Sequence, residues 1–129
     1  MTIDPKGTMQ QDQQAMMDAC IKSCLECLEW CNRCAAACIG GSGGKMSQTM
    51  ADCAKLCLDC ADACAACATV CARGSDRAGV LARACAELCA ACATACDAGC
   101  AEGCSVDDVM RRCAEACRTC AENCRQMAA

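Results

Sequence analysis

The spacing of the cysteines constrains this chain more than any other feature. In two runs the gaps alternate between four and three residues, and a third run starts the same way before it slips to repeated fours. Such spacing places the sulfurs of each run on one face of an α-helix. The four runs are Cys20, Cys24, Cys27, Cys31, Cys34 and Cys38; Cys53, Cys57, Cys60, Cys64, Cys67 and Cys71; Cys85, Cys89, Cys92, Cys96, Cys100 and Cys104; and Cys113, Cys117, Cys120 and Cys124.

The residues between the cysteines favour helix, because they are mostly alanine or exposed polar groups without β-branched alternation. We expect helices over about 8–39, 46–73, 76–103 and 106–127, with a glycine-rich loop at 40–44 and Gly74 as a C-terminal cap. Short connections favour antiparallel neighbours. The sequence therefore predicts an all-α, up-down-up-down four-helix bundle with a cysteine-lined core, forming a single domain over 1–129. The run of fours is expected to turn Cys100 and Cys104 slightly away from the axis.

The core of such a bundle has few ordinary hydrophobic residues to draw on. The chain holds 28 alanines and 22 cysteines, but only 13 leucines, isoleucines and valines together and one tryptophan. A buried cysteine is often a small hydrophobic side chain. Here leucine or isoleucine would bury more apolar area at the same positions and stabilise the bundle better. We therefore interpret the cysteines as metal ligands.

Disulfides are the next interpretation, and geometry disfavours them. Residues three or four apart on a helix have Cβ atoms about 5–6 Å apart, whereas a disulfide needs about 3.8 Å. The segment from Met1 to Asp18 has no apolar run of the length that a signal peptide requires. We expect a cytoplasmic location, where thiols stay reduced and clustered cysteines indicate metal.

Charge selects the metal. One monovalent ion per thiolate leaves the interior near neutral, whereas a zinc ion on four thiolates leaves two negative charges to bury. Thiolates also suit copper(I), which accepts low coordination numbers. We expect the 22 cysteines to hold multiple copper(I) ions, roughly one per thiolate. A metallothionein-like zinc or cadmium buffer and a thiol/disulfide redox-active helical protein stay open as alternatives.

Five methionines extend the cysteine stripes. In an antiparallel bundle Met46, Met50 and Met110 share one end, and Met17 and Met127 share the other. One hypothesis is that these thioethers offer arriving copper(I) a weak first ligand. The alternative is that they close the ends of the core as flexible hydrophobic side chains.

Other classes of function lack their residues. The chain has no histidine and no tyrosine for acid–base catalysis, and its glycines are not followed by the Lys-Ser/Thr of a phosphate-binding loop. A net charge of −4 with no basic cluster disfavours nucleic acid. We expect no enzyme activity, no nucleic-acid partner and no membrane association.

The sequence resembles the bacterial copper storage proteins over about Gln14 to Met127. The runs Cys57-Leu-Asp-Cys-Ala-Asp-Ala-Cys64 and Cys113-Ala-Glu-Ala-Cys-Arg-Thr-Cys-Ala-Glu-Asn-Cys124 carry the resemblance. It implies copper(I) held by thiolates inside the bundle, cytosolic storage, association into homotetramers, and a copper chaperone or acceptor as partner. This chain differs from the family pattern because it has no histidine near the turn between the third and fourth helices, where it reads Cys100-Ala-Glu-Gly-Cys-Ser-Val-Asp-Asp-Val-Met110.

Overall fold

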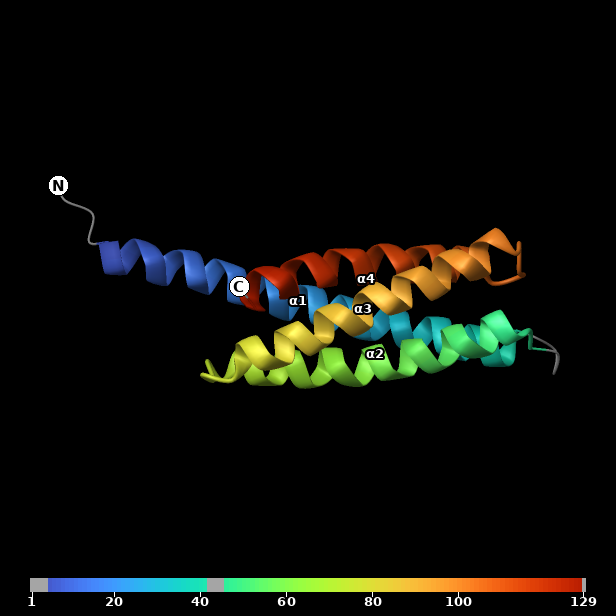
Figure 1. Cartoon of the computed structure of the whole chain (residues 1–129), viewed down its shortest axis with the longest axis horizontal. Helices are drawn as coiled ribbons and strands as arrows, with labels where there is room; N and C mark the ends of the chain where they lie inside the picture. The colour runs from blue at the N-terminus through green and yellow to red at the C-terminus, as the bar shows by residue number, and fades with distance from the viewer. Residues whose placement is uncertain (1–4, 42–45, 129) are drawn as a thin grey trace.

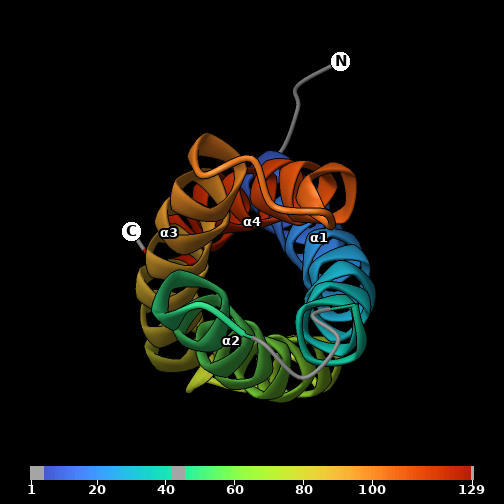
Figure 2. The same cartoon turned by 90° about the vertical axis from the view of Figure 1, so that its right-hand side faces the viewer.

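The computed structural model describes residues 5–41 and 46–128, which form four α-helices and, within those ranges, no strand. The helices are α1 (Pro5–Gly40), α2 (Gln48–Ala72), α3 (Ala78–Ala101) and α4 (Asp107–Ala128). Each helix packs against the next along the chain, and α4 closes the ring against α1. Figure 1 shows the alternating directions of the helices, and Figure 2 shows all four around one axis. The predicted up-down-up-down four-helix bundle is confirmed.

The helix ends lie within a few residues of those expected. α1 starts earlier, at Pro5, a residue that suits a first helical position because its missing N–H would have no partner there. With 36 residues α1 is longer than the other helices, and its N-terminal turns project beyond them (Figure 1). Of the expected loop at 40–44, Gly40 ends α1 and Gly41 forms a turn. The remainder of that loop lies outside the described residues.

Glycine ends two of the helices in the same way. Gly74 follows α2 with a φ of 64°, and Gly103 follows α3 with a φ of 68°. The N–H of Gly74 donates to the carbonyl of Cys71, and that of Gly103 to the carbonyl of Cys100, each over 3.0 Å. A left-handed residue just past a helix satisfies its last carbonyls and turns the chain back sharply. This geometry brings α3 back beside α2, and α4 back beside α3.

The packed interior consists almost wholly of cysteine and alanine. Alanines flank the cysteine stripes and are buried where neighbouring helices meet, as at Ala61, Ala82 and Ala114. Among the described residues the large side chains that are buried are Met50 and Met110. Helix α3 is long and apolar enough to cross a membrane by length and composition alone. Its apolar character comes from alanines and cysteines, and its buried cysteines face the bundle axis.

Candidate metal centre

All 22 cysteines lie in the described part of the chain, and 20 of them are buried. Each of these 20 has no solvent-exposed surface. Cys100 is partly exposed, as the slipped spacing of the third run predicts, and Cys104 is partly exposed in the segment that follows α3. None of the 22 is joined to another by a disulfide. The sequence-predicted ligands therefore form one interior cluster of free thiols with two cysteines at its edge.

Sulfur atoms from neighbouring helices meet along the whole axis. Between α2 and α3 the closest Sγ–Sγ distance is 3.5 Å, from Cys60 to Cys89. Between α1 and α4, Cys27 lies 3.6 Å from Cys117. Diagonally opposite helices also touch through sulfur, because Cys27 lies 3.9 Å from Cys89. The thiols therefore fill the axis of the bundle and do not merely line it.

These contacts form one connected network. Along single helices, cysteines four residues apart lie 3.7–4.0 Å from each other, for example Cys27 and Cys31 at 3.7 Å. Contacts between helices join these pairs into a path from Cys71 to Cys34 and Cys96 with no step longer than 4.0 Å. Most of the buried thiols are thus neighbours of several possible metal positions.

Several groups of four thiols have all sulfurs within 4.8 Å of one another. The groups share members, since Cys27 and Cys60 belong to two of them, as do Cys24 and Cys124. The first five groups are Cys20, Cys24, Cys67 and Cys124; Cys24, Cys85, Cys120 and Cys124; Cys27, Cys60, Cys64 and Cys89; Cys27, Cys31, Cys60 and Cys117; and Cys31, Cys57, Cys92 and Cys113. A shared sulfur is the arrangement required for a thiolate that bridges two metal ions.

The sulfur separations fit metal–thiolate bonds and not disulfides. Metal–sulfur bonds of about 2.3 Å give sulfur separations of about 3.8 Å in a tetrahedral site, about 4.0 Å in a trigonal site and about 4.6 Å in a linear site. A disulfide would need a separation of about 2.05 Å. The observed contacts of 3.5–4.0 Å therefore need only small shifts to accept a two-, three- or four-coordinate ion.

The sulfur separations fit more than one metal ion, but the candidate metals differ in the charge that they would leave buried in the interior. Among the described residues Ser23 is the single buried polar side chain, so no cation of the protein lies inside the bundle. Five zinc ions on 20 thiolates would leave about ten negative charges in this interior, at a high cost in desolvation. One monovalent soft cation per thiolate leaves none. The interior is thus suited to copper(I).

The thiols share protons across their contacts. The hydrogen bond with Cys117 lowers the pKa of the Cys27 thiol, whereas hydrogen bonds with Cys113 and then Cys27 raise the pKa of Cys117. Near the end of α2, burial raises the pKa of Cys71 to about 11. Some thiols therefore stay protonated at neutral pH. Each of them must release a proton when it binds a metal ion.

One end of the bundle, which we call the mouth, carries Cys38, Met50, Cys100, Cys104 and Met110. The Sγ of Cys104 lies 3.2 Å from the Sδ of Met110. Met110 is fully buried, and its Sδ and Cε would lie 2.5 Å from a Cβ on Gly99. The missing side chain of Gly99 therefore makes the space in which the Met110 thioether sits. The sequence analysis did not single out Gly99.

The three methionines expected together at this end differ in exposure. Thr49 donates a hydrogen bond of 2.5 Å to Glu102, which ties the start of α2 to the end of α3. Met46 is 37% exposed, whereas Met50 is 6% exposed and Met110 is inaccessible. The sulfurs that solvent reaches at the mouth are thus those of Met46, Cys100 and Cys104.

The opposite end, which we call the base, carries Met16, Met17, Cys71 and Met127. Met17 and Met127 are partly buried and pack against the cysteine core. They line a hollow of about 230 Å³ together with Met16. Sequence reasoning missed Met16, because it lies one position off the cysteine stripe of α1. Its position next to Met17 in the chain was the available indication.

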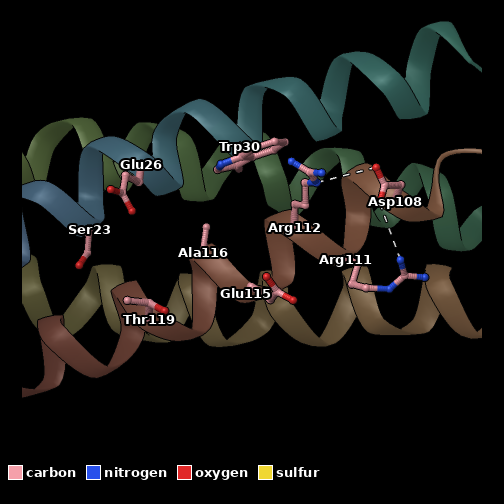
Figure 3. Close-up of a pocket in the computed structure, with 9 residues that line it drawn as sticks. All are labelled: Ser23, Glu26, Trp30, Asp108, Arg111, Arg112, Glu115, Ala116 and Thr119. Atoms are coloured by element: carbon pink, nitrogen blue, oxygen red, sulfur yellow. Dashed lines mark ion pairs between the residues drawn. The ribbon is translucent and has the colours of Figure 1, made fainter.

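A hollow of about 560 Å³ forms a groove on the outer surface between α1 and α4 (Figure 3). Its lining holds no sulfur and mixes Glu26, Asp108 and Glu115 with two arginines. The Arg112 guanidinium lies 5.5 Å from the centre of the Trp30 ring and pairs with Asp108 over 3.8 Å. This groove is lined by solvated charges and lies apart from the thiol chemistry.

Fold and site together define a class: a helical bundle whose interior is built from thiols for soft metal ions. Residues 12–129 match the copper storage protein family. The chain belongs to that family. A comparison with curated protein sequences finds no match.

Solved structures of the family have the same fold as this chain. Cu(I)-bound copper storage protein BsCsp3 is 34% identical, with a TM-score of 0.75 over 88% of this chain and 99% of that one. A cytosolic copper storage protein from Streptomyces lividans with five coppers is 35% identical, with a TM-score of 0.75 over 92% and 96%. Ccsp from Streptomyces lividans, loaded with 10 copper equivalents, is 34% identical, with a TM-score of 0.74 over 88% and 84%.

Proposed function

We propose that this protein stores copper(I) at high capacity on the thiolates inside its bundle, with the 22 cysteines as ligands. The observation that carries the proposal is the connected network of buried sulfurs, beside which no positively charged side chain is buried among the described residues. Family membership agrees, since BsCsp3 is Cu(I)-bound and Streptomyces lividans Ccsp is loaded with 10 copper equivalents in their structures. The shared four-thiol groups favour bridged copper(I) over separate zinc sites, because separate sites cannot use one sulfur twice.

Copper uptake is proposed to begin at the mouth. Met46 and Cys104 are accessible soft ligands there, and Met110 lies directly behind Cys104. An ion held by Cys104 and Met110 lies next to the interior thiols and can exchange one ligand at a time. Because this chain has no histidine near the α3–α4 turn, sulfur atoms would be the ligands that bind copper(I) there on entry.

The wider biology follows from the same proposal. The store performs no catalysis, because its thiols are ligands saturated by the cargo. It acts in the cytoplasm, as the Streptomyces lividans protein described as cytosolic does. It exchanges copper with a chaperone or acceptor, and it assembles into homotetramers. Light scattering coupled to size-exclusion chromatography tests the assembly.

The capacity is tested by anaerobic titration of the reduced protein with copper(I) against a competing chelator. We expect tight uptake of roughly one ion per thiolate. Replacing Cys27, which two four-thiol groups share, by serine should remove at least one tightly bound ion. Ala84→Ser is the matched control, because Ala84 is exposed on α3 and offers no sulfur ligand, so this variant should bind as many ions as the unsubstituted protein.

Two results would contradict the proposal. Saturation at about five ions, with zinc binding equally well and in the same number, would indicate a four-thiolate zinc buffer. Few free thiols in a denaturing thiol assay of freshly prepared protein would indicate a disulfide-linked or redox-active protein.

A further inference from the structure

The base of the bundle holds a group of soft ligands that differs from the thiol store. Met16 and Met17 of α1 and Met127 of α4 line one hollow of about 230 Å³. The rest of its lining is neutral, with Gln13, Gln126, Ser75 and Ala78 and no carboxylate. A hard cation needs anionic oxygen ligands, whereas neutral thioethers suit copper(I) and silver(I).

The hollow lies directly against the last layer of the sulfur network. Met17 precedes Cys20 by three residues and Met127 follows Cys124 by three, so each thioether lies on the same helix face as the thiol next to it. The Cys20 and Cys124 sulfurs are themselves 3.7 Å apart. All three methionines line this one hollow, and because methionine has three rotatable bonds and a polarisable sulfur, their thioethers can turn toward it.

We propose that this hollow is a thioether site for one soft monovalent cation, formed by Met16, Met17 and Met127 and separate from the thiolate store. It differs from the store in two ways. Neutral thioethers bind the ion without releasing a proton, and they bind it more weakly than thiolates do. The site is therefore filled last, after the thiols. The inference rests on the proposed copper store only for the identity of the cation as copper(I).

The site is tested by NMR of the methionine methyl groups, labelled with carbon-13, in protein whose thiols are already saturated with copper(I). One further equivalent of copper(I), added anaerobically as its acetonitrile complex, should shift the methyl signals of Met16, Met17 and Met127 together. Silver(I), added in the same way, should shift the same three signals. The triple variant Met16→Leu, Met17→Leu, Met127→Leu should lose this extra ion and keep the thiol-bound complement. Leucine is close to methionine in volume, so the base should stay packed.

The matched control is Val80→Leu, at an exposed position near the start of α3 that does not line the hollow. It should bind the extra ion as the unsubstituted protein does. Base methyl signals that do not move, or a triple variant that still takes up the extra ion, would overturn the thioether site. A low total capacity for copper(I) would instead contradict the store, and the response of the methyl groups to silver(I) would still decide the base site.

Discussion

At the scale of single residues, solvent exposure separates the cysteines into two groups. The 20 fully buried thiols are out of reach of water, while Cys100 and Cys104 are not. Burial also raises the pKa of Cys100, against the nearby Arg111 guanidinium, which acts to lower it. Met110 is placed between these two groups of thiols by a neighbour that has no side chain, Gly99. The absence of a side chain at Gly99 thus leaves the space that the Met110 thioether occupies.

Gly99 and Gly79 lie in the same helix and give a direct comparison. Replacing a helical glycine by alanine usually stabilises a protein by about 0.5–1 kcal/mol. At Gly79 a Cβ would meet its nearest neighbour at 3.7 Å, so Gly79→Ala should show this gain. At Gly99 the Cβ would push the Met110 tip away from Cys104. Gly99→Ala should therefore gain less than Gly79→Ala, or lose stability, and it should move the Met110 methyl signal.

Chemical denaturation of the apo protein measures the two changes in stability, and methyl NMR reports the position of Met110. Equal gains for the two variants with an unmoved Met110 signal would show that the niche beside Gly99 does not hold the thioether.

At the scale of the helices, the spacing of the cysteines predicts which face of each helix lies toward the bundle axis. The spacing places the stripes on the axis, and the slip in the third run correctly predicts the partial exposure of Cys100, whereas Cys104 is partly exposed because it lies beyond the end of α3. The spacing of residues along one helix does not show how a side chain packs against the neighbouring helices. It places Met110 on the inner face, but it does not predict the niche that Gly99 of a different helix provides for it, or the role of Met16, which depends on α4.

Ser47 is the N-cap of α2, and its hydroxyl oxygen accepts a hydrogen bond from the N–H of Met50 over 3.1 Å. Ser47→Ala should lower the free energy of unfolding of the apo protein by about 1 kcal/mol, because an N–H at the helix start loses its partner. Thr69→Ala is the control, since the Thr69 hydroxyl only bonds to the carbonyl of Ala65 within the same helix. Its removal should change stability by less than about 0.5 kcal/mol. Urea denaturation compares the two, and equal losses would refute the capping role.

At the scale of the whole molecule, folding and metal binding depend on each other. A core of cysteine and alanine buries less apolar surface per residue than one of leucine and isoleucine. The apo bundle is therefore expected to be only modestly stable. Copper(I) binds thiols that only the folded chain brings together, so its binding free energy adds to the free energy of folding.

Stability of the apo protein should fall in alkaline solution. The pKa of Cys71 rises from its usual value of 9.0 to about 11 in the folded state. Between these values the unfolded chain loses the proton that the folded chain keeps, so unfolding becomes more favourable as pH rises through this window. The copper-loaded protein should not show this loss, since its thiols have already released their protons. It should also melt at a higher temperature than the apo protein at every pH.

Calorimetry of both forms at pH 8 and at about pH 10.5 measures the effect. Apo and loaded protein that melted at the same temperature, or an apo form equally stable at both pH values, would contradict the coupling.

The unbroken path of sulfurs from Cys71 to Cys34 and Cys96 has a consequence for how cargo moves. An ion anywhere along it can trade one ligand for the next and travel the length of the molecule without meeting water. When an acceptor withdraws the outermost ion, its neighbour can step into the gap, and the gap migrates inward. Delivery at one end of the path would then draw on ions bound along its whole length.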